Sequence, residues 1–195
     1  MPHFKAWCQG GGMPALGRVP SSILVKEGST TYRTTLRTPL GTLGVGIGDR
    51  GALHEIWLPK RMPATESSAP SRAARATLRD ASSQLGEYFK GTRRVFELPL
   101  DPRGTDFELR VWRRLLEIPY GTTASYGAIA GELGLINGAR AVGRANGANP
   151  IPIVIPCHRV IGSDGSLVGY GGGLECKRAL LRLEGVTAVT PLQLF

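Results

Sequence analysis

A cysteine and a histidine stand side by side in residues 151–160, which read IPIVIPCHRV. The thiolate is the reactive form of cysteine, and neighbouring groups control how readily it forms. Most free cysteines are packed as small apolar side chains instead. The His-Arg pair after the cysteine favours a nucleophile at Cys157, with His158 acting directly if the chain turns here, or through a bridging water if it stays extended.

The residues before the cysteine predict how it is presented. Apolar residues and prolines alternate in residues 151–156, which indicates a short extended strand. Proline is tolerated mainly at strand edges and ends, so Pro156 is expected to end the strand. Cys157 would then lie in a turn, where unpaired backbone amides could stabilise a thiolate.

Two short predicted helices precede this strand. The first runs from residue 125 to residue 133 and is closed by Gly134, and the second begins near Asn137 and ends before Pro150. This is the helix-turn-helix plan, which often places its second helix in a nucleic-acid groove. A helical hairpin used only for packing is at least as common.

The second of these helices consists mainly of small residues. Glycine within a helix costs about 1 kcal/mol, so Gly143 and Gly147 indicate close approach of the helix backbone to a partner. If that partner is duplex DNA, the small face could enter a shallow groove and Arg140 could reach between bases. Close packing against a neighbouring helix explains the composition equally well.

The remaining elements predict an α+β fold. Segments with strand character, separated by turns, predict a small antiparallel sheet with a possible returning strand, at residues 31–38, 40–47, 52–58 and 95–98. Apolar residues at helical spacing predict further helices at residues 71–90, 105–118 and 174–183. The second of these opens with a capping box, Thr105 to Glu108.

The order of these elements predicts the domains. Residues 1–30 are expected to be a flexible N-terminal extension, and residues 31–100 a small α/β domain with the antiparallel sheet and one helix. Residues 60–70 read as a linker within it. The sequence DPRG at 101–104 marks a break, after which residues 101–195 form a mainly α-helical domain with the helix-turn-helix.

Composition limits the class of protein. The 195 residues are 42% hydrophobic and 20% charged, as in globular proteins. No apolar run reaches the about 18 residues needed to span a bilayer, and the N-terminus lacks the apolar core of a signal peptide. We therefore expect a cytosolic protein without a membrane partner. The three cysteines are odd in number and unevenly spaced, which argues against a disulfide framework.

The net charge of +9 suggests an acidic partner. Residues 1–100 carry 14 Lys/Arg against 7 Asp/Glu, and residues 101–195 carry 10 against 8, so the excess lies away from the cysteine. A general affinity for polyanions follows, but charge alone does not assign nucleic-acid binding. No metal site is predicted, because no Cys-x-x-Cys pair occurs, and a set of His3, Cys8 and His54 is the weaker alternative.

The cysteine segment belongs to a longer series of motifs. PCHRV is preceded by Asn149-Pro150 and followed by GYGGG at 169–173, and upstream lie IPYG at 118–121, SYG at 125–127 and RAVG at 140–143. In this order the motifs resemble the O6-alkylguanine-DNA alkyltransferases, or methylated-DNA–protein-cysteine methyltransferases, over residues 31–195. The resemblance implies that residues 101–195 are a DNA-binding and catalytic domain that takes an alkyl group from DNA onto its own cysteine.

The resemblance also implies roles for single residues. Cys157 matches the alkyl-accepting cysteine, His158 the histidine that takes its proton through a water, and Glu184 the glutamate that orients this histidine. Tyr126 matches the tyrosine whose hydroxyl faces N3 of the extruded guanine. Asn149 resembles a hinge between the recognition helix and the active-site strand.

Further positions match the DNA-binding helix and the base pocket. Arg140 matches the arginine that fills the space left by the extruded base, and Ala139 and Gly143 lie on the same helix. The residues that resemble the guanine pocket are Val160, Gly169, Tyr170 and Gly171.

The implied chemistry consumes the protein. Alkyl transfer leaves a thioether, which has no carbonyl for water to attack, so each molecule is expected to react once. The implied partner is double-stranded DNA carrying O6-alkylguanine, with O4-alkylthymine as a further candidate lesion, and no cofactor is required. We expect a monomer that could bind cooperatively along DNA.

Two other classes of protein fit the sequence less well. A non-catalytic protein that binds alkylated lesions would keep the helix-turn-helix and Arg140 but lack the cysteine, so Cys157 argues against it. A cysteine hydrolase would need a histidine free to contact the thiol, whereas His3 and His54 lie in the extension and in a predicted strand.

The chain departs from the family pattern at a few positions. A serine is frequent in relatives at position 171, and Gly171 cannot offer a hydroxyl to the guanine O6, so a backbone amide would serve instead. His3 and Cys8 do not reproduce the zinc-ligand set of some members. Cys176, at the start of the last predicted helix, is most simply a packed thiol.

Overall fold

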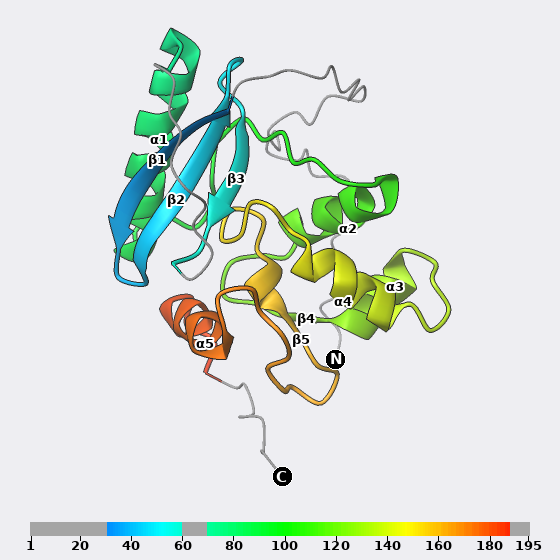
Figure 1. Ribbon diagram of the computed structural model, residues 1–195. Helices are drawn as coiled ribbons and strands as arrows, with labels where there is room; N and C mark the ends of the chain where they lie inside the picture. Colours follow the sequence, from blue (N-terminus) through cyan, green and yellow to red (C-terminus); the bar gives the residue numbers. More distant parts are fainter. Residues whose placement is uncertain (1–30, 60–69, 188–195) are drawn as a thin grey trace, which may run out of the picture.

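The computed structural model describes residues 31–59 and 70–187. The predicted extension at residues 1–30, with His3 and Cys8, and nearly all of the predicted linker at residues 60–70 lie outside the described residues. Within them the chain has the predicted α+β fold, in which a small antiparallel sheet is followed along the chain by helices (Figure 1).

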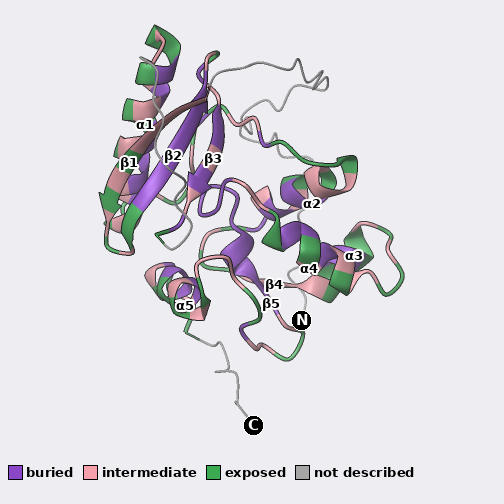
Figure 2. Ribbon diagram, in the orientation of Figure 1, coloured by how far each residue is buried: buried purple, intermediate pink, exposed green. Residues whose placement is uncertain are grey.

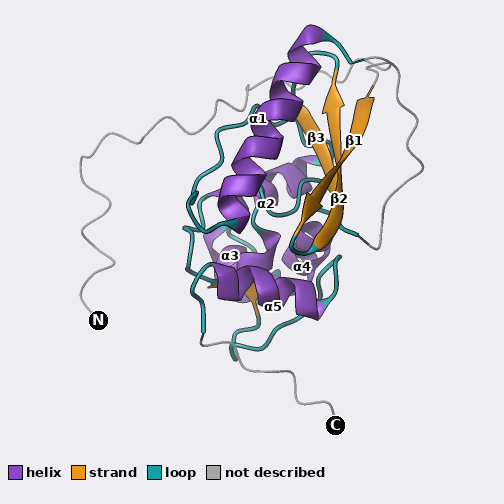
Figure 3. Cartoon of the chain, turned by 90° about the vertical axis from the view of Figure 1, so that its left-hand side faces the viewer, coloured by secondary structure: helices purple, strands orange, loops and turns teal. Residues whose placement is uncertain are grey.

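Three strands form an antiparallel meander in the order β1-β2-β3. Glycines at positive φ, Gly41 and Gly51, occupy the two turns, a conformation that glycine adopts without steric cost. The predicted strands are thereby confirmed as β1 (Thr31–Thr38), β2 (Gly41–Gly48) and β3 (Leu53–Trp57). The long helix α1 (Arg72–Phe89) lies along this sheet (Figure 3).

Residues 95–98 form no strand, contrary to the prediction. The sheet contact comes later in the chain, as a single bridge between Leu53 and Leu100. The backbone of Glu97 is held by the side chain of Gln84, which accepts from its N–H at 2.8 Å and donates to its carbonyl at 3.0 Å. These backbone groups are satisfied by an amide side chain, so no strand ladder is required.

The second half is mainly helical, as predicted. Helix α2 (Asp106–Leu116) begins with the expected capping box, in which Thr105 and Glu108 bond each other's backbone amides. The helix-turn-helix pair and the last predicted helix are present as α3 (Tyr126–Glu132), α4 (Ala139–Gly147) and α5 (Leu174–Leu183).

A buried loop, and not the predicted strand, leads to the cysteine. The N–H of Ile155 donates to the carbonyl of Ile151 at 2.9 Å, and Ile153 has a φ of 77°, so the chain turns back on itself. Residues 151–160 are all buried, and their apolar sequence reflects complete burial on every side rather than strand alternation. The chain then forms a short 3-10 helix, Cys157–Arg159.

The 3-10 helix continues into a short strand that anchors it. Strand β5 (Val160–Ile161) pairs in parallel with β4 (Ala124–Ser125), which directly precedes α3. The cysteine is therefore tied to the helix-turn-helix through backbone pairing.

A continuous hydrophobic core includes buried residues from both halves of the described chain, and it lies between the sheet and the helices (Figure 2). The amide of Ile56 in β3 donates to the carbonyl of Pro150 at 2.8 Å, so the sheet edge is bonded directly to the segment before the cysteine. The division into domains at residues 100 and 101 stays a prediction. No described helix is both long and apolar enough to cross a membrane.

Candidate active site

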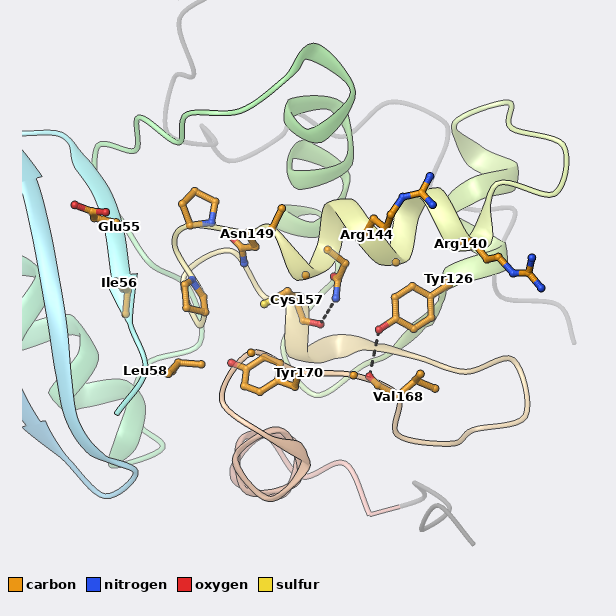
Figure 4. A pocket seen from close by; sticks show the side chains of 18 of the residues that line it. Glu55, Ile56, Leu58, Tyr126, Arg140, Arg144, Asn149, Cys157, Val168 and Tyr170 are labelled. Atoms are coloured by element: carbon orange, nitrogen blue, oxygen red, sulfur yellow. Dashed lines mark hydrogen bonds between the residues drawn. The ribbon is translucent and has the colours of Figure 1, made fainter. Parts of the chain in front are cut away.

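A cavity of about 980 Å³ opens beside Cys157. One wall is α4, a second is the loop at residues 168–171, and the third is strand β3 with Leu58 after it. Figure 4 shows Cys157, Tyr126 and Tyr170 around this space, with Ile56 and Leu58 across from them. The cavity therefore combines elements of both halves of the chain.

The Cys157 thiol lies at the buried end of this cavity. Only 4% of the residue is exposed, and burial raises the pKa of the thiol to about 11, although a hydrogen bond from Asn149 and the charge of Lys177 act in the opposite direction. The N–H of Cys157 donates to the carbonyl of Ile155 at 2.8 Å, and its own hydrogen bond to the thiol is a smaller effect that also lowers the pKa. At neutral pH the resting side chain is a neutral thiol that needs a base.

His158 is hydrogen-bonded to Glu184, the residue to which the resemblance assigns its orientation. Its Nε2 lies 2.8 Å from Oε1 of Glu184, and both side chains are fully buried. Burial lowers the pKa of His158, although the hydrogen bond and charge of Glu184 oppose this. The neutral ring then donates from Nε2, which leaves Nδ1 as a lone-pair acceptor with no partner among the described residues.

Glu184 is held by several donors. Arg159 donates from Nε at 2.8 Å and from Nη2 at 2.9 Å, the hydroxyl of Tyr88 donates at 2.7 Å, and the N–H of Gly121 donates at 3.2 Å. Burial alone would raise the pKa of Glu184, but the hydrogen bonds from His158 and Arg159 outweigh it and lower the pKa to about 2. The carboxylate therefore stays ionised at neutral pH.

Tyr126, the first residue of α3, stands on another side of the cavity. Its hydroxyl donates to the carbonyl of Val168 at 3.3 Å (Figure 4). Burial, and then the charge of Cys157, raise its pKa to about 12, so the phenol remains a proton donor at neutral pH. The same carbonyl accepts from Nζ of Lys177 at 2.8 Å.

Asn149 joins the end of α4 to the loop before the cysteine. Its Oδ1 accepts from the N–H of Ile151 at 3.0 Å, and its Nδ2 donates to the carbonyl of Ile155 at 2.8 Å. The side chain therefore closes the turn that carries Cys157 and also reaches the thiol.

The predicted DNA-binding residues border the cavity along one face of α4. Ala139, Arg140, Gly143 and Arg144 all line it, and both arginines are exposed. Figure 4 shows the side chain of Arg140 extending away from the protein at the mouth. A Cβ on Gly143 would lie 3.8 Å from the Tyr126 ring, so glycine here leaves space beside that ring.

The predicted pocket residues divide into two groups. Gly169, Tyr170 and Gly171 line the cavity, and the buried hydroxyl of Tyr170 has no partner among the described residues. Val160 does not line it, because its side chain is fully buried and its carbonyl accepts from Nζ of Lys177 at 2.5 Å.

Four residues have contacts at the site that were not anticipated from the sequence. Tyr88 and Lys177 lie far from the cysteine in the chain, Asn146 lies near it but has no distinctive spacing, and Arg159 stood out beside His158 without its contact to Glu184 being predicted. Complete burial of a lysine is rare, yet the sequence around Lys177 is that of an ordinary amphipathic helix. The described residues contain no cluster of His, Cys, Asp and Glu suited to a metal ion.

Comparison with known proteins identifies the family. Residues 31–102 match the family described as 6-O-methylguanine DNA methyltransferase, ribonuclease-like domain, and residues 106–186 match its DNA binding domain. The methylated-DNA–protein-cysteine methyltransferase of Mycobacterium bovis is 58% identical over 115 residues, which cover 59% of this chain and 70% of the relative. That of Methanosarcina acetivorans is 53% identical over 154 residues, which cover 79% of this chain and 98% of the relative.

A solved structure agrees with these matches. The crystal structure of Mycobacterium tuberculosis OGT in complex with DNA aligns with a TM-score of 0.71 and 46% identity, and covers 78% of this chain and 92% of that chain. Together with the matches to both domain families, this similarity shows that the chain belongs to the methylated-DNA–protein-cysteine methyltransferase family.

Proposed function

We propose that this protein repairs DNA by transferring one alkyl group from O6 of an alkylated guanine to Sγ of Cys157. The observation that carries the proposal is a buried thiol at the end of a large cavity, followed directly by a histidine that a buried carboxylate orients. The crystallised relative bound to DNA supports DNA as the partner. O4-alkylthymine remains a second candidate lesion.

The thiol requires a base before it can attack. With a pKa of about 11, roughly one thiol in ten thousand is ionised at pH 7. Nδ1 of His158 accepts the proton, directly or through one water molecule, because Nε2 is committed to Glu184. The ionised Glu184 stabilises the imidazolium that forms.

The alkyl carbon is then transferred from the guanine oxygen to the cysteine sulfur in one displacement step. The Sγ–C bond forms as the C–O6 bond breaks, and the electron pair of that bond leaves with the guanine. Tyr126 donates a proton to N3 of the base as this negative charge develops. The imidazolium of His158 then loses its proton and the Tyr126 phenolate regains one, both by exchange with solvent, so that overall the thiol proton is exchanged for the alkyl group.

The lesion must leave the duplex to reach Cys157. An enzyme that acts on a base atom rotates the nucleotide into a pocket, at a cost of about a few kcal/mol for unstacking. Arg140, exposed at the mouth of the cavity, inserts into the stack and offsets part of this cost. Ala139 and Gly143 let α4 approach the groove closely.

The stability of the product limits each protein molecule to one alkyl transfer, so activity is measured as moles of adduct per mole of protein. A thioether at Cys157 is not hydrolysed, so each protein molecule, acting as a monomer, reacts once. A lesion-binding protein without catalysis is disfavoured because Cys157 is a free cysteine followed directly by a histidine that contacts a carboxylate.

Intact-mass measurement after incubation with a duplex containing O6-methylguanine tests the proposal. We expect one added methyl group per protein, mapped to Cys157 by peptide analysis, and no addition to Cys157→Ala. Cys176→Ala is the matched control, because it removes the other described thiol and should leave the adduct unchanged. An unmodified parent protein, or an adduct that survives in Cys157→Ala, would refute the proposal.

A further inference from the structure

Helix α1 carries a row of positive charge that the proposed alkyl transfer does not use. The buried residues of this helix pack on the sheet. At about 100° per residue, the side opposite to them presents, in order, Arg72, Arg75, Arg79, Ser83, Gly86 and Lys90. The arginines and the lysine of this basic stripe are all exposed, and the stripe runs about 27 Å along the helix. It accounts for part of the positive excess of residues 1–100.

The basic stripe does not serve the stability of the helix. The partial positive charge at a helix N-terminus disfavours nearby cations, yet Arg72 and Arg75 lie near this end of α1, whose first turn has no acidic residue. The ion pair of Arg79 with Asp80 is weak, because it spans 3.7 Å between side chains that are 80% and 54% exposed. An anionic partner would offset the repulsion within the stripe.

The middle of the basic stripe leaves room for such a partner. Gly86 lies within α1, where glycine is less favourable than alanine, and a Cβ added to it would meet nothing within 4 Å. Packing among the described residues therefore does not require glycine at this position. Together with the short side chain of Ser83, Gly86 lets a partner approach the helix closely between Arg79 and Lys90.

The basic stripe lies far from the helix that resembles a recognition helix. Figure 1 shows α1 and the sheet at one side of the molecule and α3 and α4 at the other. The cavity at Cys157 opens between α4 and β3, and none of the described residues of α1 lines it. A short duplex held against α4 would therefore leave the stripe exposed to solvent.

We propose that the basic stripe of α1 is a second DNA-binding surface, which holds the phosphate backbone of a second duplex while α4 faces the first. DNA is the polyanion that the DNA-binding domain family already associates with this chain. Contacts to phosphates carry no sequence information, so this binding should not depend on sequence. It should weaken steeply with salt, because each cation that neutralises a phosphate releases a counterion. The proposal does not depend on transfer chemistry at Cys157.

The test mixes the protein at low ionic strength with unmodified duplexes of about one helical turn, about 34 Å, and counts the components of each complex by native mass spectrometry. We expect the parent to form complexes of one protein with two duplexes. The double variant Arg72→Gln, Arg79→Gln should bind the second duplex more weakly. In titrations at several salt concentrations, its slope of log affinity against log salt for the second duplex should be shallower by about 2.

The matched control is the double variant Arg37→Gln, Arg182→Gln, which removes the same charge from exposed positions on β1 and α5 and should bind the second duplex like the parent. Equal losses in the two double variants would overturn the inference, because net charge and not the stripe would then hold the second duplex. A parent that binds a single duplex, or that holds two duplexes only in complexes with two protein molecules, would also overturn it. Preference of the second site for an RNA duplex would exclude DNA as its partner. Methyl transfer to Cys157 is not measured, so failure of the proposed function would leave this result unaffected.

Discussion

The carboxylate of Glu184 should supply a pH-dependent part of the stability. Burial alone would raise its pKa, but the hydrogen bonds from His158 and Arg159 outweigh this and lower it from 4.5 to about 2. A carboxyl group with a depressed pKa in the folded state stabilises the fold above its unfolded pKa and loses this contribution as the pH falls through the folded value. At about 1.36 kcal/mol per unit, Glu184 contributes about 3 kcal/mol at neutral pH, lost between about pH 5 and pH 2.

Urea unfolding of the parent and of Glu184→Gln across this pH range measures the contribution. The variant should be less stable at pH 7 by about 3 kcal/mol or more, because the buried Arg159 guanidinium loses its carboxylate partner. Its stability should also depend less on pH. The control is Glu132→Gln, which breaks a partly exposed ion pair with Arg114 and should cost less than about 1 kcal/mol. Parallel stability curves for the parent and Glu184→Gln would refute this reasoning.

Three further outcomes are expected. Tyr88→Phe removes a hydrogen bond to the charged Glu184 and should lower the free energy of unfolding by about 1.5–3 kcal/mol. The control Tyr120→Phe removes a hydrogen bond to a backbone carbonyl and should lower it by about 1 kcal/mol. Equal losses for the two variants in urea unfolding would contradict this prediction. The rate at which iodoacetamide labels Cys157 should keep rising with pH beyond about pH 9, because burial raises the pKa of the thiol to about 11. A labelling rate that levels off just above the ordinary thiol pKa of about 8.5 would show that burial does not raise the pKa of Cys157. Arg140→Ala should slow methyl transfer from duplex DNA more than from single strands, and an unchanged duplex rate at equal binding would exclude a role in base extrusion.

Much of the fold could be predicted because its signals are local. The capping box at Thr105, the glycine turns of the sheet and the apolar spacing of the helices act within a few residues, and the structure contains the corresponding elements. Local patterns failed where tertiary contacts satisfied the backbone instead. Gln84 bonds Glu97 across a distance of 13 residues, and complete burial made a turning loop look like an alternating strand at residues 151–155.

The sequence by itself indicated the candidate nucleophile and the family. A cysteine followed by His-Arg, placed after a helix of small residues and before a glycine-rich loop, was sufficient to indicate a nucleophile and to suggest the family. These motifs could be recognised because each of them is a short run of neighbouring residues.

Only the tertiary structure decided what surrounds that group. It brought Tyr88 to the carboxylate of Glu184, 96 residues away, buried the amine of Lys177 against the carbonyl of Val160, and left the Oδ1 of Asn146 unpaired beside the cavity. Hydrogen bonding and burial depend on which segments meet in space, and both control the ionisation of Cys157 and the shape of its pocket. The sequence therefore indicated which atom is the candidate nucleophile, and the packing of distant segments around it set the burial and hydrogen bonding of that atom.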